Sequence, residues 1–392
     1  MENNFKKYWR IDENITFLNH GSFGATPIPI LEKQAELRNL IEKEPVKFFV
    51  RDYEEYYENA RISLSNFIGS SQKDIVFVPN ATTGVNTALR SIPLKENDEI
   101  IVTNQEYNAC RNALNYIAKE KNAVVKEVEI PFPVKSFDEI LEKLINSVTK
   151  KTKYLLIDHI SSPTALIVDA KTIVKEMKRL GVETIVDGAH STGQIPLNLK
   201  EIEPAYYTSN CHKWLCTPKG SAFLYVREDF QKITKPLVIS HGENSPRTDK
   251  SKFFLEFFWT GTGDPTPFLT IPCAIDFFNT LIEGGLYEIM KRNRKLCLQA
   301  RDFICQKLSI EKPCPDEMVG SMASFPISDS KIEPKPPLFI DSLQDKLFFD
   351  YKIEVPIIYF PKYPKRILRI SAQIYNDFEE YQRLSEILKK LI

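Results

Sequence analysis

The chain has 392 residues, enough for two domains, and its 52 Lys and Arg residues are balanced by 52 Asp and Glu residues. This balance gives no reason to expect a nucleic acid or an anionic membrane surface as a partner, so small or neutral partners are favoured. The apolar share of 43% is typical of a globular protein with a large buried core.

Seven cysteines are scattered along the chain, with no CxxC pair and no metal-ligand spacing. A chain of this size does not need disulfides for stability, so we expect reduced thiols and no bound metal. The amino-terminal segment MENNFKKYWRIDENITF has no apolar signal region, and no run approaches the ~20 apolar residues that span a bilayer. The sequence therefore favours a cytoplasmic protein without a membrane partner.

From about residue 74 to 226, short β-rich runs alternate with helix-length amphipathic segments. This alternation predicts an α/β fold with a mostly parallel, seven-stranded sheet covered by helices. In such sheets ligands bind at the carboxyl ends of the strands. The predicted strands are IVFV at 75, EIIVT at 99, VVKEVEI at 124, YLLID at 154, ETIVD at 183, YYTS at 206 and SAFLYV at 221.

Beyond about residue 265, long helical stretches at 267–309 and 377–392 surround shorter β runs near 318–328, 353–360 and 366–371. We predict a large domain over residues 16–265 and a smaller α+β domain over residues 266–392. Residues 1–15 could pack on the smaller domain. The Pro-rich segment IEPKPPLF at 332 is predicted to be a loop.

The segment Asn80-Ala81-Thr82-Thr83-Gly84 follows one predicted strand and opens a predicted helix. Its backbone N–H groups and hydroxyls would meet at the positive end of the helix dipole, which suits an anion. Ordinary N-capping by Asn or Thr is the alternative. A lysine further along the chain that could bind a phosphate-bearing cofactor favours the anion site.

Lys213 stands between His212 and Trp214 at the end of another strand, where an ammonium would be poorly hydrated. Desolvation would lower the pKa of the amine and free it as a nucleophile. Asp187 ends the preceding strand, and a carboxylate there could keep the pyridine nitrogen of pyridoxal phosphate protonated. The pair predicts a pyridoxal-phosphate site with Lys213 as the Schiff-base lysine. A solvated surface lysine is the alternative.

Two further motifs are ambiguous on spacing alone. The guanidinium of Arg369 could bind a substrate carboxylate through two parallel hydrogen bonds, but a structural salt bridge competes with that interpretation. The Gly-rich turn at 259–264 carries two hydroxyls, and a plain loop is its alternative.

Together these motifs resemble the class V aminotransferase-fold enzymes of the fold-type I pyridoxal-phosphate superfamily, and isopenicillin N epimerase-like proteins in particular. The resemblance covers most of the chain. The matching segments are FLNHGSFGATP at 17, FVPNATTGVNTAL at 77, NQEYNACRNAL at 104, DHISSPTALIVD at 158, IVDGAHSTGQIPL at 185, SNCHKWLCTPKGSAFLYV at 209, WTGTGDPTP at 259 and LRISAQIYND at 368.

The resemblance implies a role for each matched position. Lys213 would bind the cofactor covalently, Asp187 would pair with the pyridinium nitrogen, and His190 would approach the ring hydroxyl. Tyr107 would stack on the cofactor face, where related enzymes have an aromatic or imidazole ring. The other implied cofactor contacts are Ala81, Thr82, Thr83, Ser162, Asn210 and His212, with Gly261 and Thr262 reaching across from the partner subunit of a homodimer. The implied substrate contacts are Arg369, His20 and Ser22.

One departure from the family narrows the range of reactions that the protein could catalyse. Cysteine desulfurases of this superfamily use a cysteine shortly before the substrate-binding arginine, and residues 345–368 contain none. A persulfide-forming desulfurase is therefore disfavoured. Tyr107 in place of a stacking His also removes an imidazole that could move protons at the cofactor.

The motifs do not choose among the reactions that can follow loss of the α-proton of an amino acid. We favour β-elimination by a carbon–sulfur lyase acting on a cysteine derivative. Epimerisation and transamination are the alternatives within the family. A cofactor-binding regulatory protein without catalysis is the rival from another class.

Overall fold

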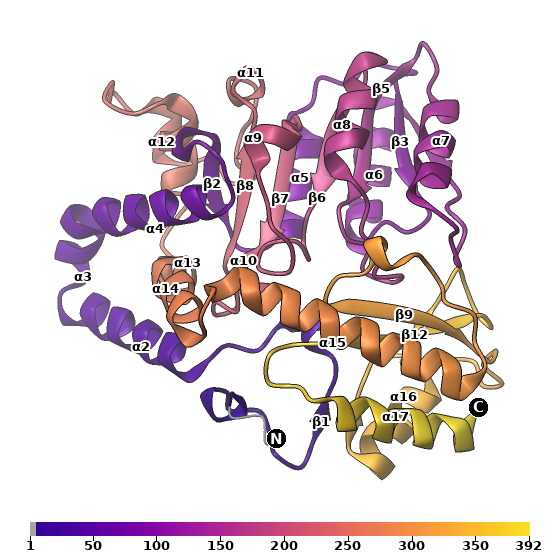
Figure 1. Cartoon of the computed structure of the whole chain (residues 1–392). Coiled ribbons are helices and arrows are strands. Elements are labelled where there is room, and N and C mark those ends of the chain that lie inside the picture. The colour runs from indigo at the N-terminus through magenta and orange to yellow at the C-terminus, as the bar shows by residue number, and fades with distance from the viewer. Residues whose placement is uncertain (1–4) are drawn as a thin grey trace.

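The computed structural model describes residues 5–392, and a seven-stranded, mostly parallel sheet lies at its centre (Figure 1). The strand order is β2-β8-β7-β6-β5-β3-β4, and β8 alone runs against its neighbours. The predicted α/β fold is confirmed. The strands are β2 (Ile75–Val78), β3 (Glu99–Thr103), β4 (Val124–Val128), β5 (Thr152–Asp158), β6 (Glu183–Asp187), β7 (Tyr206–Asn210) and β8 (Ala222–Val226).

Successive side chains of these strands enter two different hydrophobic cores, one on each face of the sheet. In β3, Ile100 and Val102 belong to one core and Ile101 to the other. Alternate side chains of a strand point to opposite faces of the sheet, and both faces of a covered parallel sheet are buried. The sequences of these strands are therefore continuous apolar runs. Helices α5 (Ala81–Ser91) and α6 (Asn108–Lys121) contribute to one core, and α7 (Phe137–Ser147) and α8 (Ala170–Arg179) contribute to the other.

The remaining helices lie before the sheet, between its last strands or after it in the sequence. They are α1 (His20–Phe23), α2 (Ile28–Lys43), α3 (Pro45–Lys47), α4 (Tyr53–Phe67), α9 (Leu199–Ile202), α10 (Cys211–Trp214), α11 (Glu228–Gln231), α12 (Lys252–Phe258), α13 (Thr266–Leu269), α14 (Ile271–Leu281), α15 (Gly285–Leu308), α16 (Ser342–Tyr351) and α17 (Phe378–Leu391). Within residues 5–392, none of the helices has the length and apolar character needed to cross a membrane.

A second, antiparallel sheet of three strands forms from the last third of the chain, with the order β11-β12-β9. Its strands are β9 (Met322–Ile327), β11 (Ile357–Tyr359) and β12 (Arg366–Ser371). Helices α15 and α17 pack against each other beside it (Figure 1). The predicted division of the chain at residue 265 stays a prediction.

The amino-terminal segment is joined to the last third of the chain. Strand β1 (Thr16–Phe17) pairs in parallel with β10 (Ile353–Glu354). Before it, Trp9 packs edge-on against Tyr375 and Phe277. Residues 1–4 of the segment predicted to pack on the smaller domain lie outside the described residues.

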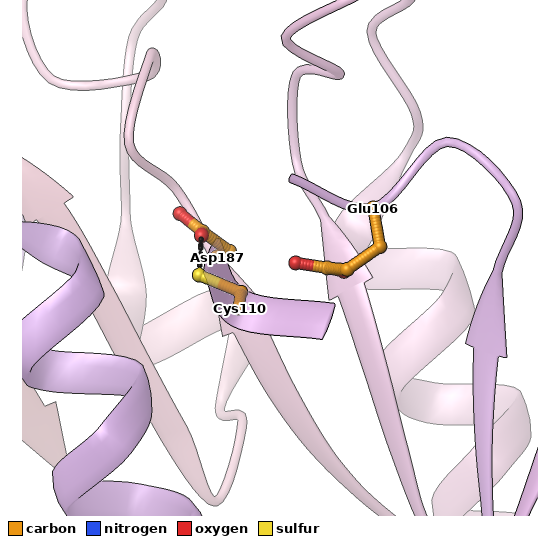
Figure 2. A group of neighbouring side chains, drawn as sticks. All are labelled: Glu106, Cys110 and Asp187. Carbon is orange, nitrogen blue, oxygen red and sulfur yellow. Dashed lines mark hydrogen bonds between the residues drawn. The ribbon is translucent and has the colours of Figure 1, made fainter. Parts of the chain in front are cut away.

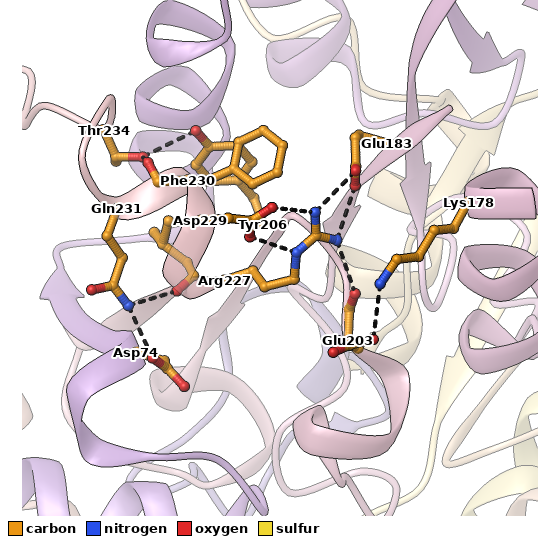
Figure 3. Close-up of polar contacts among 11 residues, drawn as sticks. Asp74, Lys178, Glu183, Glu203, Tyr206, Arg227, Asp229, Phe230, Gln231 and Thr234 are labelled. Carbon is orange, nitrogen blue, oxygen red and sulfur yellow. Dashed lines mark hydrogen bonds and ion pairs between the residues drawn. The ribbon is translucent and has the colours of Figure 1, made fainter. Parts of the chain in front are cut away.

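A network around Arg227 connects the end of β8 to the start of β6 (Figure 3). The guanidinium donates two hydrogen bonds to Glu183 at 2.9 and 3.0 Å and two to Asp229 at 2.7 and 2.8 Å. The side chain is only 12% exposed, and it also covers the ring of Phe230 at 5.0 Å. Because bidentate and partly buried ion pairs are worth more than surface pairs, this network should stabilise the sheet.

We expect Arg227→Ala to lower the free energy of unfolding by about 1–3 kcal/mol, since it leaves Glu183 without its partner at a half-buried site. Lys171→Ala is the matched control, because its pair with Glu201 is more than half exposed on both sides, and such pairs contribute about 0–1 kcal/mol. Denaturant unfolding of both variants measures the difference. Equal losses would contradict a special role for Arg227.

Candidate active site

A cavity of about 150 Å³ opens where the parallel strands end, and most of the predicted site residues line it. The parallel arrangement explains this, because β5, β6 and β7 all point their carboxyl ends to the same edge of the sheet. The lining residues are Ser22, Phe23, Asn80, Ala81, Thr82, Tyr107, Asp158, Ser162, Asp187, Ala189, His190, Asn210, His212 and Lys213.

The turn that carries Lys213 is held by the segment before α2. Nε2 of His20 lies 2.9 Å from the Lys213 carbonyl oxygen, so this nitrogen donates, and Nδ1 accepts from the Tyr375 hydroxyl at 2.8 Å. Burial lowers the pKa of His20 to about 3, which keeps the ring neutral. Gly24 has a φ of +71°, and a Cβ there would lie 2.3 Å from the His212 carbonyl oxygen. A side chain at position 24 would therefore displace the turn.

The Lys213 amine is a nucleophile at moderate pH. Burial, and then the positive charge of Arg369, lower its pKa to about 8, while the negative charges of Asp187 and Asp158 oppose the shift. Its Nζ lies 3.1 Å from His190 Nε2. The indole N–H of Trp214 donates to His190 Nδ1 at 3.5 Å, so Nε2 carries the proton and faces the amine.

Asp187 ends β6 with its carboxylate buried and hydrogen-bonded on both oxygens. The Ala189 amide donates to Oδ1 at 2.8 Å, and the Cys110 thiol donates to Oδ2 at 3.2 Å (Figure 2). Burial raises the pKa of Asp187, and these two hydrogen bonds and the charge of Lys213 act against the rise. The two donors favour the charged carboxylate over the neutral acid.

The start of helix α5 faces the cavity, and two of its backbone amides are already hydrogen-bonded to side chains of the protein. Asn80 accepts the Thr83 amide at 2.9 Å, and Asn210 accepts the Ala81 amide at 2.8 Å. Thr82 lines the cavity between them. The second amide of a helix has no partner within the helix, so the Thr82 N–H is suited to an anion.

His212 also lines the cavity, and its ring is neutral. Its Nδ1 donates to the Ser221 carbonyl at 2.8 Å, and burial lowers its pKa to about 4. Nε2 is then an acceptor. A phosphate would have to raise the pKa of this ring before Nε2 could donate a hydrogen bond to it.

Arg369 reaches the cavity wall through two serines. It donates to the Ser162 carbonyl at 2.5 Å and to the Ser22 hydroxyl at 3.0 Å. Its Nε is buried and has no hydrogen-bond partner in the described part of the chain. Burial lowers the pKa of Arg369 to about 10, so the guanidinium remains a cation at neutral pH. The free Nε–H is available to an acceptor such as a carboxylate.

Five predicted site residues do not line this cavity, and Arg369, which is held by two lining serines, is one of them. His20 lies behind Lys213, as described above, and both the amide and the hydroxyl of Thr83 are used by Asn80. Gly261 lines a separate, aromatic cavity, and Thr262 is exposed next to it.

Three ionisable groups in or beside the cavity were not predicted. Asp158 is the last residue of β5 and lies at the same edge of the sheet as Asp187. Its position at the end of a strand is the sequence signal that could have identified it. Cys110 and Glu106 flank Tyr107 and lie beside Asp187 (Figure 2). Their position depends on the turn between β3 and α6, for which the sequence offers no comparable signal.

The chain is similar to known proteins along most of its length. Residues 44–331 match the family model Aminotransferase class-V. The chain is similar to isopenicillin N epimerase of Amycolatopsis lactamdurans, with 30% identity over 99% of this chain and 98% of that protein. It is also similar to a probable chloroplastic L-cysteine desulfhydrase of Arabidopsis thaliana, with 28% identity over 97% of this chain and 84% of that protein.

A solved structure shares the fold. The structure of a cystine C–S lyase with its product cysteine persulfide superposes with a TM-score of 0.79, at 21% identity over 96% of this chain and 97% of that one.

In the cofactor-free protein, we expect acylation of Lys213 to reach its half-maximal rate near pH 8, because the amine reacts only when deprotonated. Lys171 is the internal control, since its hydrogen bond with Glu201 raises the pKa of its amine. Peptide mass spectrometry across a pH series measures both rates. In Arg369→Gln the midpoint for Lys213 should move upward, and a wild-type midpoint near 10 would refute the assignment.

Proposed function

The chain belongs to the class V aminotransferase family, and from this premise we propose that it is a pyridoxal-phosphate-dependent carbon–sulfur lyase acting on a cysteine derivative. The observation that supports the proposal best is the Lys213 amine, whose pKa is lowered to about 8, in one cavity with the Asp187 carboxylate. The named activity of the Arabidopsis relative, an L-cysteine desulfhydrase, favours cleavage at sulfur.

The residues of the cavity fit the cofactor by their chemistry. An amine, a buried carboxylate and the start of a helix line one space, and they match an aldehyde, a pyridine nitrogen and a phosphate respectively. Lys213 would take the aldehyde, Asp187 the ring nitrogen, and Thr82 with Asn210 the phosphate. His190 and Ser162 are further contacts, and Tyr107 offers an aromatic face. Bound pyridoxal phosphate would supply an electron sink for the bond pair left at the substrate α-carbon.

Arg369 would bind the substrate, and Lys213 would transfer its protons. The guanidinium of Arg369 is a cation with an unpaired Nε–H, so it can bind the α-carboxylate and fix the orientation of the α-hydrogen. The neutral amine of Lys213 then accepts that proton as general base. The C–S bond breaks with its electron pair on sulfur, and the new Lys213 ammonium can protonate the leaving group. Hydrolysis of the remaining fragment yields pyruvate and ammonia.

Epimerisation is the second candidate, because the relative with 30% identity is an isopenicillin N epimerase. It needs the same proton removal at Lys213 and differs in the return of a proton to the opposite face. Persulfide formation by a cysteine is disfavoured, because residues 345–368 contain no cysteine.

We also propose a homodimer in the cytoplasm. Gly261 and Thr262 are exposed and lie outside the Lys213 cavity of their own chain, which supports a role in the cavity of a partner subunit. The seven free cysteines suit a reducing compartment.

The activity is tested by proton NMR of the cofactor-loaded protein in deuterium oxide with L-cysteine, cysteine conjugates, cysteine sulfoxides and other L-amino acids. Pyruvate from a cysteine-type substrate is the expected result. Exchange of the α-proton with growth of the other stereoisomer would assign an epimerase, and a new keto acid with amination of the cofactor would assign a transaminase. An unchanged cofactor spectrum with every amino acid would indicate a binding protein without catalysis.

Lys213→Ala should abolish turnover, with a loss of at least about 10³-fold, because it removes both the nucleophile and the base. Pyruvate release under saturating substrate measures the loss. Lys171→Ala, far more exposed and paired with Glu201, should keep wild-type turnover. Full activity in Lys213→Ala would overturn the proposed mechanism.

Arg369→Lys should raise KM by about 10–100-fold and change kcat less, because an ammonium cannot replace a fork that binds the serines and a carboxylate together. Steady-state kinetics with the best substrate from the NMR panel separate the two constants. A KM equal to that of the wild type would remove Arg369 from substrate binding.

A further inference from the structure

Glu106 is a buried carboxyl group that the proposed mechanism does not use. It lies between β3 and α6, is 8% exposed, and neither of its carboxyl oxygens has a hydrogen-bond partner among residues 5–392. In Figure 2 its carboxyl group points toward Cys110 and Asp187. One oxygen of Glu106, the Cys110 sulfur and one oxygen of Asp187 all lie within 4.8 Å of one another.

The charges around Glu106 are mostly of its own sign. Burial, and then the negative charge of Asp187, raise the pKa of Glu106 well above its usual range. Glu106 in turn raises the pKa of Asp158 and Cys110. Arg111 is the nearby cation, and with the Tyr107 amide it acts in the opposite direction.

Both terminal nitrogens of Arg111 are engaged by other groups, and its buried Nε has no hydrogen-bond partner among the described residues. It donates to Glu127 and to the Thr103 carbonyl, each at 2.5 Å. Like charges at short range in a buried site cannot all ionise, so the cluster must retain protons at neutral pH.

The carboxyl groups of Glu106, Asp187 and Asp158 differ in their surroundings, and the difference decides which of them keeps a proton. Asp187 accepts two hydrogen bonds, which favour its charged form. Asp158 lines both the Lys213 cavity and a second cavity of about 20 Å³, which has room for one water molecule. Glu106 lines neither of these cavities. Of the three, Glu106 therefore has the least support for a negative charge.

We propose that Glu106 remains a neutral carboxylic acid beside Asp187, so that it adds no negative charge to that of Asp187 facing the cofactor ring. Glu106 is then a positioning residue, because it acts on the ring only through Asp187. The link to the ring rests on the proposed function, whereas the proton on Glu106 does not.

The pH dependence of unfolding tests the proton directly. Above the ordinary pKa of glutamate the unfolded chain has released this proton and the folded chain has not, so rising pH destabilises the wild type until the folded group ionises. Glu106→Gln lacks this effect. Its unfolding constant should fall relative to that of the wild type as pH rises from 5 to 9, by up to about tenfold per pH unit for one proton.

The test uses denaturant unfolding of the cofactor-free full chain, with Glu129→Gln as the matched control. Glu129 is exposed, and its variant should follow the wild type at every pH. A Glu106→Gln curve parallel to that of the wild type would overturn the proposal. Because no cofactor or substrate is present, this outcome is independent of a failure to find lyase activity.

A second measurement examines the cofactor-loaded protein and does not require Glu106→Gln to fold. In loaded Asp158→Asn, infrared spectroscopy at pH 7 should show a protonated-carboxyl band that disappears on alkaline titration. The absence of this band would overturn the proposal. If loaded Glu106→Gln is obtained, its cofactor affinity at pH 7 should stay within about threefold of the wild type, because the carboxamide preserves the neutral charge. A loss above tenfold would show that the charge of Glu106 is needed.

Discussion

The amine of Lys213 is subject to two opposing electrostatic effects, and the chemistry of the cavity depends on their balance. Burial and the cation of Arg369 lower its pKa, whereas Asp187 and Asp158 raise it. If the carboxylates prevailed, the amine would remain an ammonium and could not attack a carbonyl. If desolvation alone acted, the amine would be a weaker base for an α-proton. A value of about 8 leaves it able to serve in both roles.

This balance requires that groups from distant parts of the chain keep fixed positions. The parallel sheet supplies Asp158 and Asp187 from adjacent strand ends. Arg369 comes from the second sheet, and Ser22, close to the amino terminus, holds one of its nitrogens. The Ser371 hydroxyl accepts the Gly21 amide at 3.0 Å, which adds a second link between these two segments. The substrate side of the cavity is therefore built between two sheets.

Strand ends could be located from the sequence because apolar runs and turn residues mark them locally. That local signal was enough to predict that Asp187, Lys213 and the start of α5 lie at strand ends of the sheet, where they line the same cavity. Resemblance to the family was needed for Arg369, since the serines that hold it lie about 200 and 350 residues away in sequence.

Three features escaped prediction for physical reasons. Helix α16 buries only Leu343 and Leu347, too few apolar positions to mark a helical period. Glu106 looked like an ordinary acidic residue in a turn, and its unpaired burial follows from tertiary packing alone. The aromatic cavity next to Gly261 likewise depends on rings from α4, α12 and α13 that meet only in the folded chain.

The contact of His20 with both Lys213 and Tyr375 has a consequence for synthesis on the ribosome. The large sheet can assemble once residue 226 has emerged, but the ring of His20 is held at both nitrogens only after residue 375 follows. The nascent chain thus carries Lys213 in an incompletely fixed turn until residue 375 has been made. The turn that carries Lys213 is therefore completed only near the end of synthesis, because one of the earliest segments to be made and one of the latest both hold it.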